Sequence, residues 1–252
     1  MFQEVPLIGY RASITMGFYF IAIGYYFLLF AYFLIIRFRK TRRRYWLLFS
    51  IFFLMLALSG AGFIIHDFFI SPLEFATRAL VWRIASFFGW LAILCMVEIL
   101  VILMFTGTQK WVRIVKIGLP LFYVLMAVLI FVLPESLVCE GCPSTVENQF
   151  LQNVFNYSYP EGRFWLNGII LPVTTILFPV LFFNLGYRSA GVIRCSSMLN
   201  GLGFLLYFVG RLIEPMPFVA NSEHLGIMLL PPSFILISLL ILVIANQYEH
   251  LK

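Results

Sequence analysis

The sequence predicts an all-α fold, a polytopic membrane bundle of seven transmembrane helices, and three observations lead to this prediction. The 252-residue chain is 62% hydrophobic and only 11% charged, and its mean hydropathy of +0.99 is far above that of a domain with a solvated surface. Its apolar runs are continuous and about as long as a membrane-spanning helix requires, roughly 20 residues. They lack the period-two alternation of barrel strands. Few residues remain for a soluble region, so 1–252 is expected to form one domain.

Seven segments are long and apolar enough to cross a membrane. They lie near residues 15–37, 45–69, 80–105, 114–134, 164–187, 193–214 and 225–246, and the outer loop 135–163 is the longest connection. The first span is expected to be retained, because its apolar run is too long for a cleavable signal peptide. Pro172 and Pro179 in the fifth span, and Pro231-Pro232 in the seventh, are expected to bend their helices.

Basic residues gather on one side of the predicted bundle. Twelve of the 17 lysines and arginines lie in the loops after the first, third and fifth spans or at the C-terminus: Arg37, Arg39, Lys40, Arg42, Arg43, Arg44, Lys110, Arg113, Lys116, Arg188, Arg194 and Lys252. Nine of the 11 acidic residues fall at the opposite ends. Because basic loops stay in the cytoplasm, the N-terminus is expected outside and the C-terminus inside the cell membrane. The first basic loop could also hold anionic lipid headgroups, although topology alone explains its charge.

The second and third spans carry the first candidate functional residues. Small residues from Ser59 to Gly62 predict close packing of the second span against a neighbour. In the third span, Glu98 shares a helical face with Arg83 and Trp90. A carboxylate inside a membrane is costly, so Glu98 is expected to be protonated, hydrogen-bonded or in a water-filled cavity. Asn200, at a similar predicted depth, is its expected partner, in either a proton-coupled or a purely structural role.

The sixth span carries a polar stripe. Ser197, Asn200, Phe204, Tyr207, Arg211 and Glu214 recur every three or four residues in an apolar segment, which places them on one helical face. Polar groups are costly toward lipid, so this face is predicted to meet protein or water. Glu98, Ser197 and Asn200 are therefore predicted to form an intramembrane polar network.

Polar and aromatic residues also mark the predicted outer halves of four spans. The candidate ligand-binding residues are His66, Asp67, Arg83, Trp90, Trp165, Asn167, Tyr207, Arg211 and Glu214. If they converge, they form an outward-opening pocket with two arginines, suited to a carboxylate or phosphate on a small or amphiphilic ligand. Alternatively, these charges pair with one another, Arg211 with Asp67 or Glu214, and close the bundle.

The four cysteines divide by location. Cys139 and Cys142 lie in the predicted outer loop, where oxidising conditions favour a disulfide over a redox pair or half of a zinc site. Cys95 and Cys195 lie within spans, as small buried hydrophobes do. Asn156 begins a glycosylation sequon in the same outer loop.

The residues that several membrane chemistries need are missing from the sequence. The seventh span has no lysine for a retinal Schiff base, the histidines lie at span edges or in the tail rather than where haem is held, and there is no glycine-rich phosphate loop. His66, Asp67 and His224 could approach one another, but without a metal-ligand spacing. No enzymatic activity, metal or cofactor is expected.

Seven spans with an outer N-terminus, a basic first loop and no large soluble domain resemble the seven-helix sensory modules at the N-terminus of prokaryotic signalling proteins such as histidine kinases. The resemblance rests on topology and implies a receptor. Such modules continue into an output domain, whereas here only ANQYEHLK follows the last apolar residues. The resemblance therefore implies a separate cytoplasmic or membrane signalling partner.

The leading functional prediction is a receptor-like protein in which an outer ligand moves the proline-containing spans. A small-solute or proton-coupled transporter, with a path from Arg211 past Asn200 to Glu98, is the second prediction. A non-catalytic subunit of a membrane complex is the third. Membrane lipids are expected partners and nucleic acid is not, because the positive charge is confined to loop positions.

Overall fold

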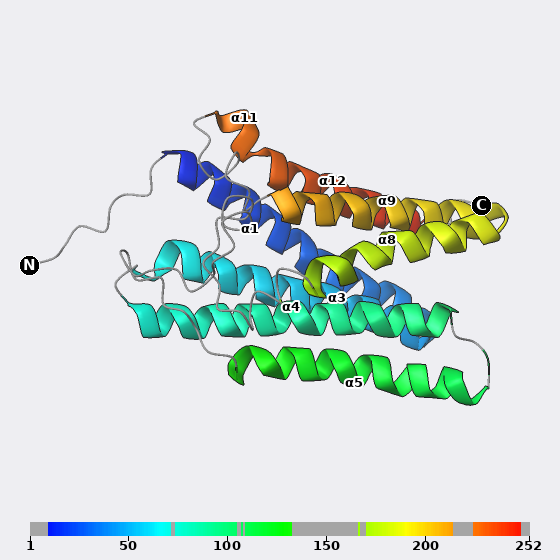
Figure 1. Cartoon of the computed structure of the whole chain (residues 1–252). Helices are drawn as coiled ribbons and strands as arrows, with labels where there is room; N and C mark the ends of the chain where they lie inside the picture. The colour runs from blue at the N-terminus through cyan, green and yellow to red at the C-terminus, as the bar shows by residue number, and fades with distance from the viewer. Residues whose placement is uncertain are drawn as a thin grey trace, which may run out of the picture.

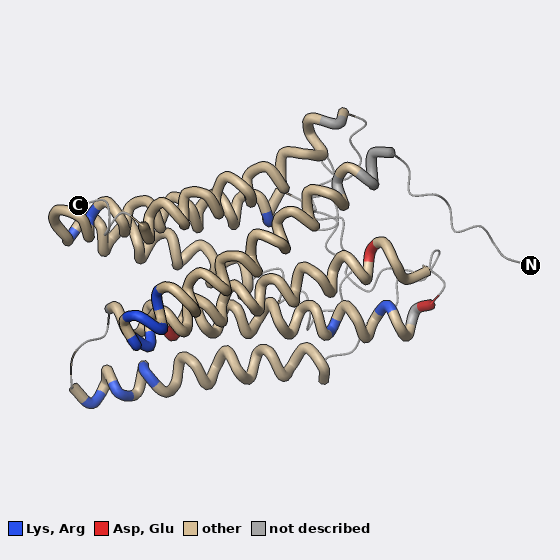
Figure 2. Tube along the Cα trace, turned by 180° about the vertical axis from the view of Figure 1, so that it is seen from behind, with Lys and Arg blue, Asp and Glu red and all other residues tan. Residues whose placement is uncertain are grey.

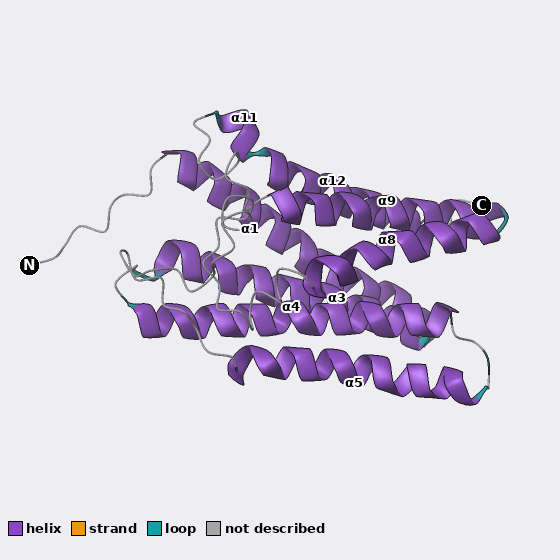
Figure 3. Ribbon diagram, viewed as in Figure 1, coloured by secondary structure: helices purple, strands orange, loops and turns teal. Residues whose placement is uncertain are grey.

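The computed structural model of the protein describes residues 10–71, 74–104, 107, 109–132, 166, 170–213 and 224–247. Every regular element in these ranges is helical (Figure 3). They include seven helices long and apolar enough to span a membrane, which confirms the predicted all-α bundle. Cys139, Cys142 and Asn156 lie outside the described residues, so the disulfide and the glycosylation site stay predictions.

The first span consists of α1 (Tyr10–Ala31), the π-helix η1 (Tyr32–Phe38) and the short α2 (Arg39–Thr41). The second consists of α3 (Arg44–Ile64) and the π-helix η2 (Ile65–Phe69). The later spans are α4 (Phe75–Met104), α5 (Lys110–Val132), α8 (Leu171–Arg188), α9 (Gly191–Ile213) and α12 (Leu230–Gln247), and the short α11 (Leu225–Met228) precedes the last of them (Figure 1). The predicted spans therefore correspond one to one with the observed ones.

Three of the five prolines in the described helices lie in a first turn, and the other two, Pro120 and Pro179, are internal. A turn at Leu229 separates α11 from α12, and Pro231 and Pro232 lie in the first turn of α12. Pro172 lies in the first turn of α8, where only Pro179 is internal. The first turn of a helix tolerates proline because its N–H groups have no intrahelical partner. The seventh span is therefore interrupted at Leu229, directly before the proline pair that was expected to bend it.

The long helices pack in two groups. In the first group, α3 packs along both α1 and α4, and α4 also packs along α5. In the second group, α9 packs along α8 and α12. The two groups meet less extensively, where α1 contacts α12 and α4 contacts α8. The boundary between the groups is therefore the natural place for a cavity.

Small residues let helices within each group approach closely. A Cβ atom added to Gly62 on α3 would lie 2.7 Å from the Cβ of Ala85 on α4. A Cβ added to Gly203 on α9 would lie 2.8 Å from Cγ of Leu242 on α12. The first contact confirms the close packing predicted for Ser59 to Gly62.

The two ends of the bundle differ in charge (Figure 2). Lysines and arginines gather where α2 meets α3, where α5 begins and where α8 meets α9, and we call this the basic end. Asp67 and Glu74 lie at the opposite end, together with Arg78, Arg83 and Arg211. The gathering of basic loops on one side agrees with the prediction from the sequence.

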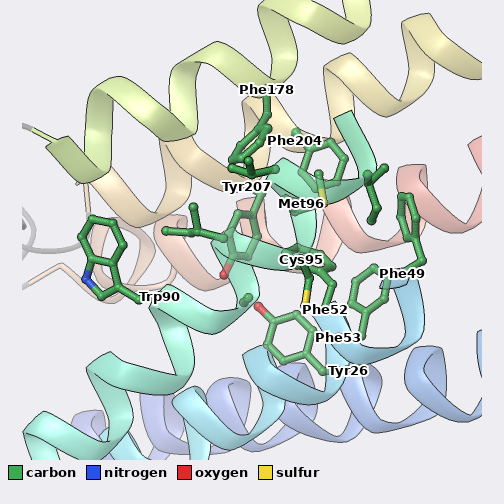
Figure 4. Packing of buried hydrophobic residues seen from close by; sticks show 14 of the residues in the cluster. Tyr26, Phe49, Phe52, Phe53, Trp90, Cys95, Met96, Phe178, Phe204 and Tyr207 are labelled. Atoms are coloured by element: carbon green, nitrogen blue, oxygen red, sulfur yellow. The ribbon is translucent and has the colours of Figure 1, made fainter. Parts of the chain in front are cut away.

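The core is built mainly from aromatic rings, and Figure 4 shows such side chains from α1, α3, α4, α8 and α9 pointing toward the middle of the bundle. The ring of Phe33 in η1 lies 5.6 Å from that of Phe53 in α3. Phe204 in α9 lies 6.1 Å from Phe52 in α3, so this pair joins the two helix groups at mid-bundle. Cys95 is buried with a free thiol, which confirms its predicted place as a small core residue.

Candidate functional site

A cavity of about 560 Å³ lies between the two helix groups, in the half of the bundle opposite the basic end. Its volume falls within the range of about 300–1,000 Å³ that is usual for small-molecule sites. Most of its lining is aromatic, aliphatic or glycine. The aromatic residues are Tyr19, Tyr26, Phe52, Phe63, Phe68, Trp82, Trp90, Phe178, Tyr207 and Phe208, and the polar ones are Ser59, His66, Asp67, Ser86, Thr175 and Arg211.

The two ends of the cavity differ in exposure. Toward the basic end it finishes at Met96 and Phe178, which are 1% and 2% exposed. At the other end the side chain of Asp67 is 53% exposed, and Arg211 is also exposed. We call this accessible end the rim. The cavity is therefore accessible at the rim and closed toward the basic end.

The cavity is elongated along α4. Trp82, Ser86, Gly89, Ile93 and Met96 line it at steps of three and four residues, so they share one face of that helix. The distance along the helix axis from Trp82 to Met96 is about 21 Å at 1.5 Å per residue. The space is therefore elongated along α4.

Charged side chains in the described lining are confined to the rim. His66 and Asp67 come from the π-helix η2, and His66 Nδ1 lies 2.6 Å from Asp67 Oδ1. Arg211 comes from the last turn of α9, and its guanidinium carbon lies 5.9 Å from the centre of the Phe63 ring, a cation–π arrangement. Short π-helical turns within α-helices are frequent at functional sites. The rim therefore combines charge of both signs with an irregular backbone.

The structure places five of the nine predicted ligand-binding residues around this one cavity: His66, Asp67, Trp90, Tyr207 and Arg211. Trp165, Asn167 and Glu214 lie outside the described residues. Arg83 is described but does not line the cavity. Its neighbour Trp82 does, because one position along an α-helix turns the side chain by about 100°.

The predicted network of Glu98, Ser197 and Asn200 is wrong. Glu98 Oε2 lies 3.3 Å from Arg44 Nη2 at the basic end, where the two side chains are 29% and 75% exposed. Asn200 Oδ1 instead accepts a hydrogen bond of 3.1 Å from Asn246 Nδ2. Glu98 is not isolated in the interior, because α4 brings it beside the start of α3. Ser197, Asn200, Phe204 and Tyr207 are buried, so this part of the predicted stripe faces protein, whereas Arg211 is exposed.

Sequence reasoning missed a polar network at the basic end. The sequence predicts Arg37 in the first basic loop, yet it is only 4% exposed. Its Nε donates a 3.2 Å hydrogen bond to Tyr32 Oη, its Nη2 donates to the backbone carbonyl of Asn246, and its guanidinium carbon lies 5.0 Å from the Trp46 ring centre. The sequence held a signal: Arg37 continues the helical phase of the buried Leu29 and Phe33.

The polar groups deep in the cavity are hydroxyls, which donate and accept hydrogen bonds without carrying charge. Within the described ranges, no three His, Cys, Asp or Glu side chains gather as metal ligands do. This arrangement suits noncovalent binding of a molecule that is largely apolar and has its charged group at the rim. Comparison of the chain with protein-family models, curated proteins and solved structures finds no match.

Proposed function

We propose that this protein is a receptor-like membrane protein that binds a small or amphiphilic ligand in the cavity between its two helix groups. The observation that carries the proposal is the position of the cavity, whose walls come from helices of both groups. A ligand held there contacts both groups at once. If it fits one arrangement of the groups better than another, its binding shifts the population of arrangements, and this shift is the signal.

The charge distribution supports an orientation for this receptor. Basic loops are retained in the cytoplasm, so the basic end faces the cytoplasm of the cell and the rim faces outward. In this orientation the ligand arrives from outside. The exposed basic residues of α2 and of the start of α5 then face a signalling partner, the arrangement that the resemblance to seven-helix sensory modules implies.

A small-solute transporter is the second candidate, and the same cavity favours it. A cavity that is accessible at one end and closed at the other is what a transporter presents in one state of an alternating-access cycle. The proton path through Glu98 loses its support, because Glu98 pairs with Arg44 at the basic end and Asn200 bonds to Asn246. Transport, if it occurs, therefore has to use the cavity itself.

The test adds a side chain to the cavity wall. The protein in lipid nanodiscs is screened against a panel of single-chain amphiphiles and small aromatic compounds, and binding is detected as a rise in the unfolding temperature. We expect Ser86→Leu, which fills the cavity, to abolish the rise without lowering the starting temperature. Gly118→Leu is the matched control, since a Cβ there meets nothing within 4 Å. Stabilisation that survives Ser86→Leu would contradict binding in this cavity.

A second experiment separates the two candidates. Spin labels at Lys110 and Arg188, both exposed at the basic end and on different helix groups, report the distance between the groups. For a stabilising compound, a changed distance without uptake into vesicles supports the receptor. Uptake of that compound into vesicles, abolished by Ser86→Leu, supports the transporter instead.

A further inference from the structure

We infer that the ligand of the cavity carries an uncharged carbonyl or hydroxyl oxygen in the middle of an apolar body, and that this oxygen accepts hydrogen bonds from Ser59 and Ser86. This inference rests on the proposed function, because it assigns the chemistry of the molecule held in the same cavity. Three observations carry it: the unused donors of the two serines, their position along the cavity and the apolar walls on either side of them.

The hydroxyl groups of the two serines have unused donors. Ser59 and Ser86 line the cavity and are only 6% and 8% exposed. Within the described ranges neither hydroxyl makes a hydrogen bond, and the only side-chain polar atom sealed there without a partner is Arg78 Nε, so both serine oxygens border open space. Each hydroxyl has one O–H donor, and a buried donor without an acceptor is costly. The two serines therefore favour a ligand that brings an acceptor.

The two serines lie together near the middle of the cavity. A Cβ atom added to Gly89 of α4 would lie 3.3 Å from Ser59 Oγ, so Ser59 of α3 lies beside Gly89. Ser86 precedes Gly89 by three residues, which is about 4.5 Å along the helix axis. On the lining face of α4, Gly89 is seven residues from both Trp82 and Met96. An oxygen bound to the two serines is therefore far from both ends of the cavity.

The walls on either side of the serines are apolar. Phe52, Met96 and Phe178 line the cavity toward the basic end, and Phe63 and Trp82 line it toward the rim. Burying aliphatic or aromatic surface against these walls is favourable. A charged oxygen between the serines would lose its hydration with no opposite charge at this depth of the described lining. The central oxygen is therefore uncharged, and apolar parts of the ligand extend from it in both directions.

The experiment compares compounds that differ only at a central carbon. Dihexyl ketone and dibenzyl ketone are each compared with the corresponding alcohol and with the hydrocarbon in which CH₂ replaces the carbonyl. Apparent dissociation constants are taken from the rise in unfolding temperature of the full chain in nanodiscs, corrected for the amount of each compound that dissolves in empty nanodiscs. In at least one series the ketone or the alcohol is expected to bind about 10-fold or more tighter than the hydrocarbon, because it gains two hydrogen bonds.

Alanine variants test the assignment to the serines. Ser59→Ala and Ser86→Ala should each lower the ratio of ketone to hydrocarbon affinity by about 3-fold or more, and the double variant should abolish the preference. Ser238→Ala is the matched control, because the Ser238 hydroxyl donates a 2.6 Å bond to the carbonyl of Ile235 and does not line the cavity. This control should retain the full preference.

The variants without compound test whether the donors are unused. Removing a hydroxyl that has no partner in the described part of the chain should leave the unfolding temperature unchanged or raise it. A fall in Ser59→Ala and Ser86→Ala as large as that in Ser238→Ala would show that the two serines bond within the bundle. That result would overturn the inference.

The outcomes separate this inference from the proposed function. Equal binding of ketone, alcohol and hydrocarbon, with all lost in Ser86→Leu, keeps the receptor cavity and overturns the central oxygen. A preference that survives the double alanine variant overturns the assignment to the serines. Failure of both ketones and both alcohols, when another compound of the panel binds in the cavity, also overturns the inference and leaves the proposed function standing. Failure of these compounds and of the whole amphiphile and aromatic panel contradicts both.

Discussion

The basic end and the cavity half of this bundle place polar groups in opposite ways. At the basic end, Arg37, Asn200 and Asn246 are each no more than 4% exposed and bond to one another's helices. In the cavity half, Ser86 and Tyr207 border an open space. Polar groups are scarce in both regions. The difference teaches that an intramembrane polar group links helices where it bonds to a neighbouring helix, and can take part in a site where it borders a cavity.

The hydrogen bonds at the basic end join the two helix groups through the end of α12. Ser196 Oγ of α9 donates a 2.8 Å hydrogen bond to the carbonyl of Ala245, and Arg37 of η1 donates to the carbonyl of Asn246. Carbonyls in the last turn of a helix have no intrahelical partner, and the negative end of the helix dipole favours a cation. The network therefore caps α12 with groups from its neighbours. In the cavity half, a hydroxyl bond of 2.9 Å from Tyr123 to Thr174 links α5 to α8.

The largest expected loss of stability comes from removing Arg37, the charged residue of the polar network at the basic end. Arg37→Leu removes the bonds to Tyr32 and Asn246 and leaves the Asn246 carbonyl without its donor. Hydrogen bonds to charged groups contribute about 1.5–3 kcal/mol each, and losing one partner of a buried polar pair adds a desolvation cost. We expect the free energy of unfolding, measured by SDS titration in bicelles, to fall by about 3 kcal/mol.

Arg39→Leu is the control for this change, since Arg39 is exposed two positions further along the chain. It should alter the free energy of unfolding by less than about 0.5 kcal/mol. Similar losses in the two variants would show that removal of basic charge, rather than of the buried network, destabilises the protein.

The type and number of the helices could be predicted from the sequence because a membrane allows so few structures. Backbone groups in hydrocarbon must bond within their own segment, so a continuous apolar run of about 20 residues predicts a helix. The breaks within spans were harder. Local turn chemistry divides the seventh span at Leu229. Hydropathy reports composition over a window and does not resolve such breaks.

The site was predicted less completely, because periodicity assigns a face to a residue but does not say what that face meets. The predicted stripe of the third span was anchored on Arg83 and Glu98, whereas the lining face runs through Trp82 and Ser86. Glu98 found Arg44, which is 54 residues away in the chain, and no local pattern encodes that pair. Arg37 was assigned to the basic loop because of the exposed basic residues that follow it, whereas it continues the helical phase of the buried Leu29 and Phe33.

A double-mutant cycle on Asn200 and Asn246 would measure the coupling free energy of one interhelical hydrogen bond at the basic end. Asn246 Nδ2 donates 3.1 Å to Asn200 Oδ1, and each amide also bonds within its own helix. Interhelical hydrogen bonds in membranes couple by about 0.6 kcal/mol on average, so we expect about 1 kcal/mol between the two alanine substitutions. Asn246→Ala with Thr174→Ala should be additive, because Thr174 bonds to Tyr123 in the opposite half of the bundle. Coupling as large in this control pair would show that the network is not local.

The smallest effect is expected at Glu98, the residue that the sequence marked most strongly. The Arg44–Glu98 pair lies at the basic end with both side chains partly in contact with the surroundings, and such exposed pairs contribute about 0–1 kcal/mol. Glu98→Gln should therefore change the free energy of unfolding by about 0.5 kcal/mol or less, and it should leave binding of the amphiphile panel unchanged because Glu98 does not line the cavity. Arg44→Gln should have the same small effect, since either change removes the same ion pair. A loss of several kcal/mol in Glu98→Gln, with none in Arg44→Gln, would mean that the carboxylate bonds elsewhere in the interior. The contrast between a hydrogen-bonded basic end and a hollow opposite half would then be incorrect at Glu98.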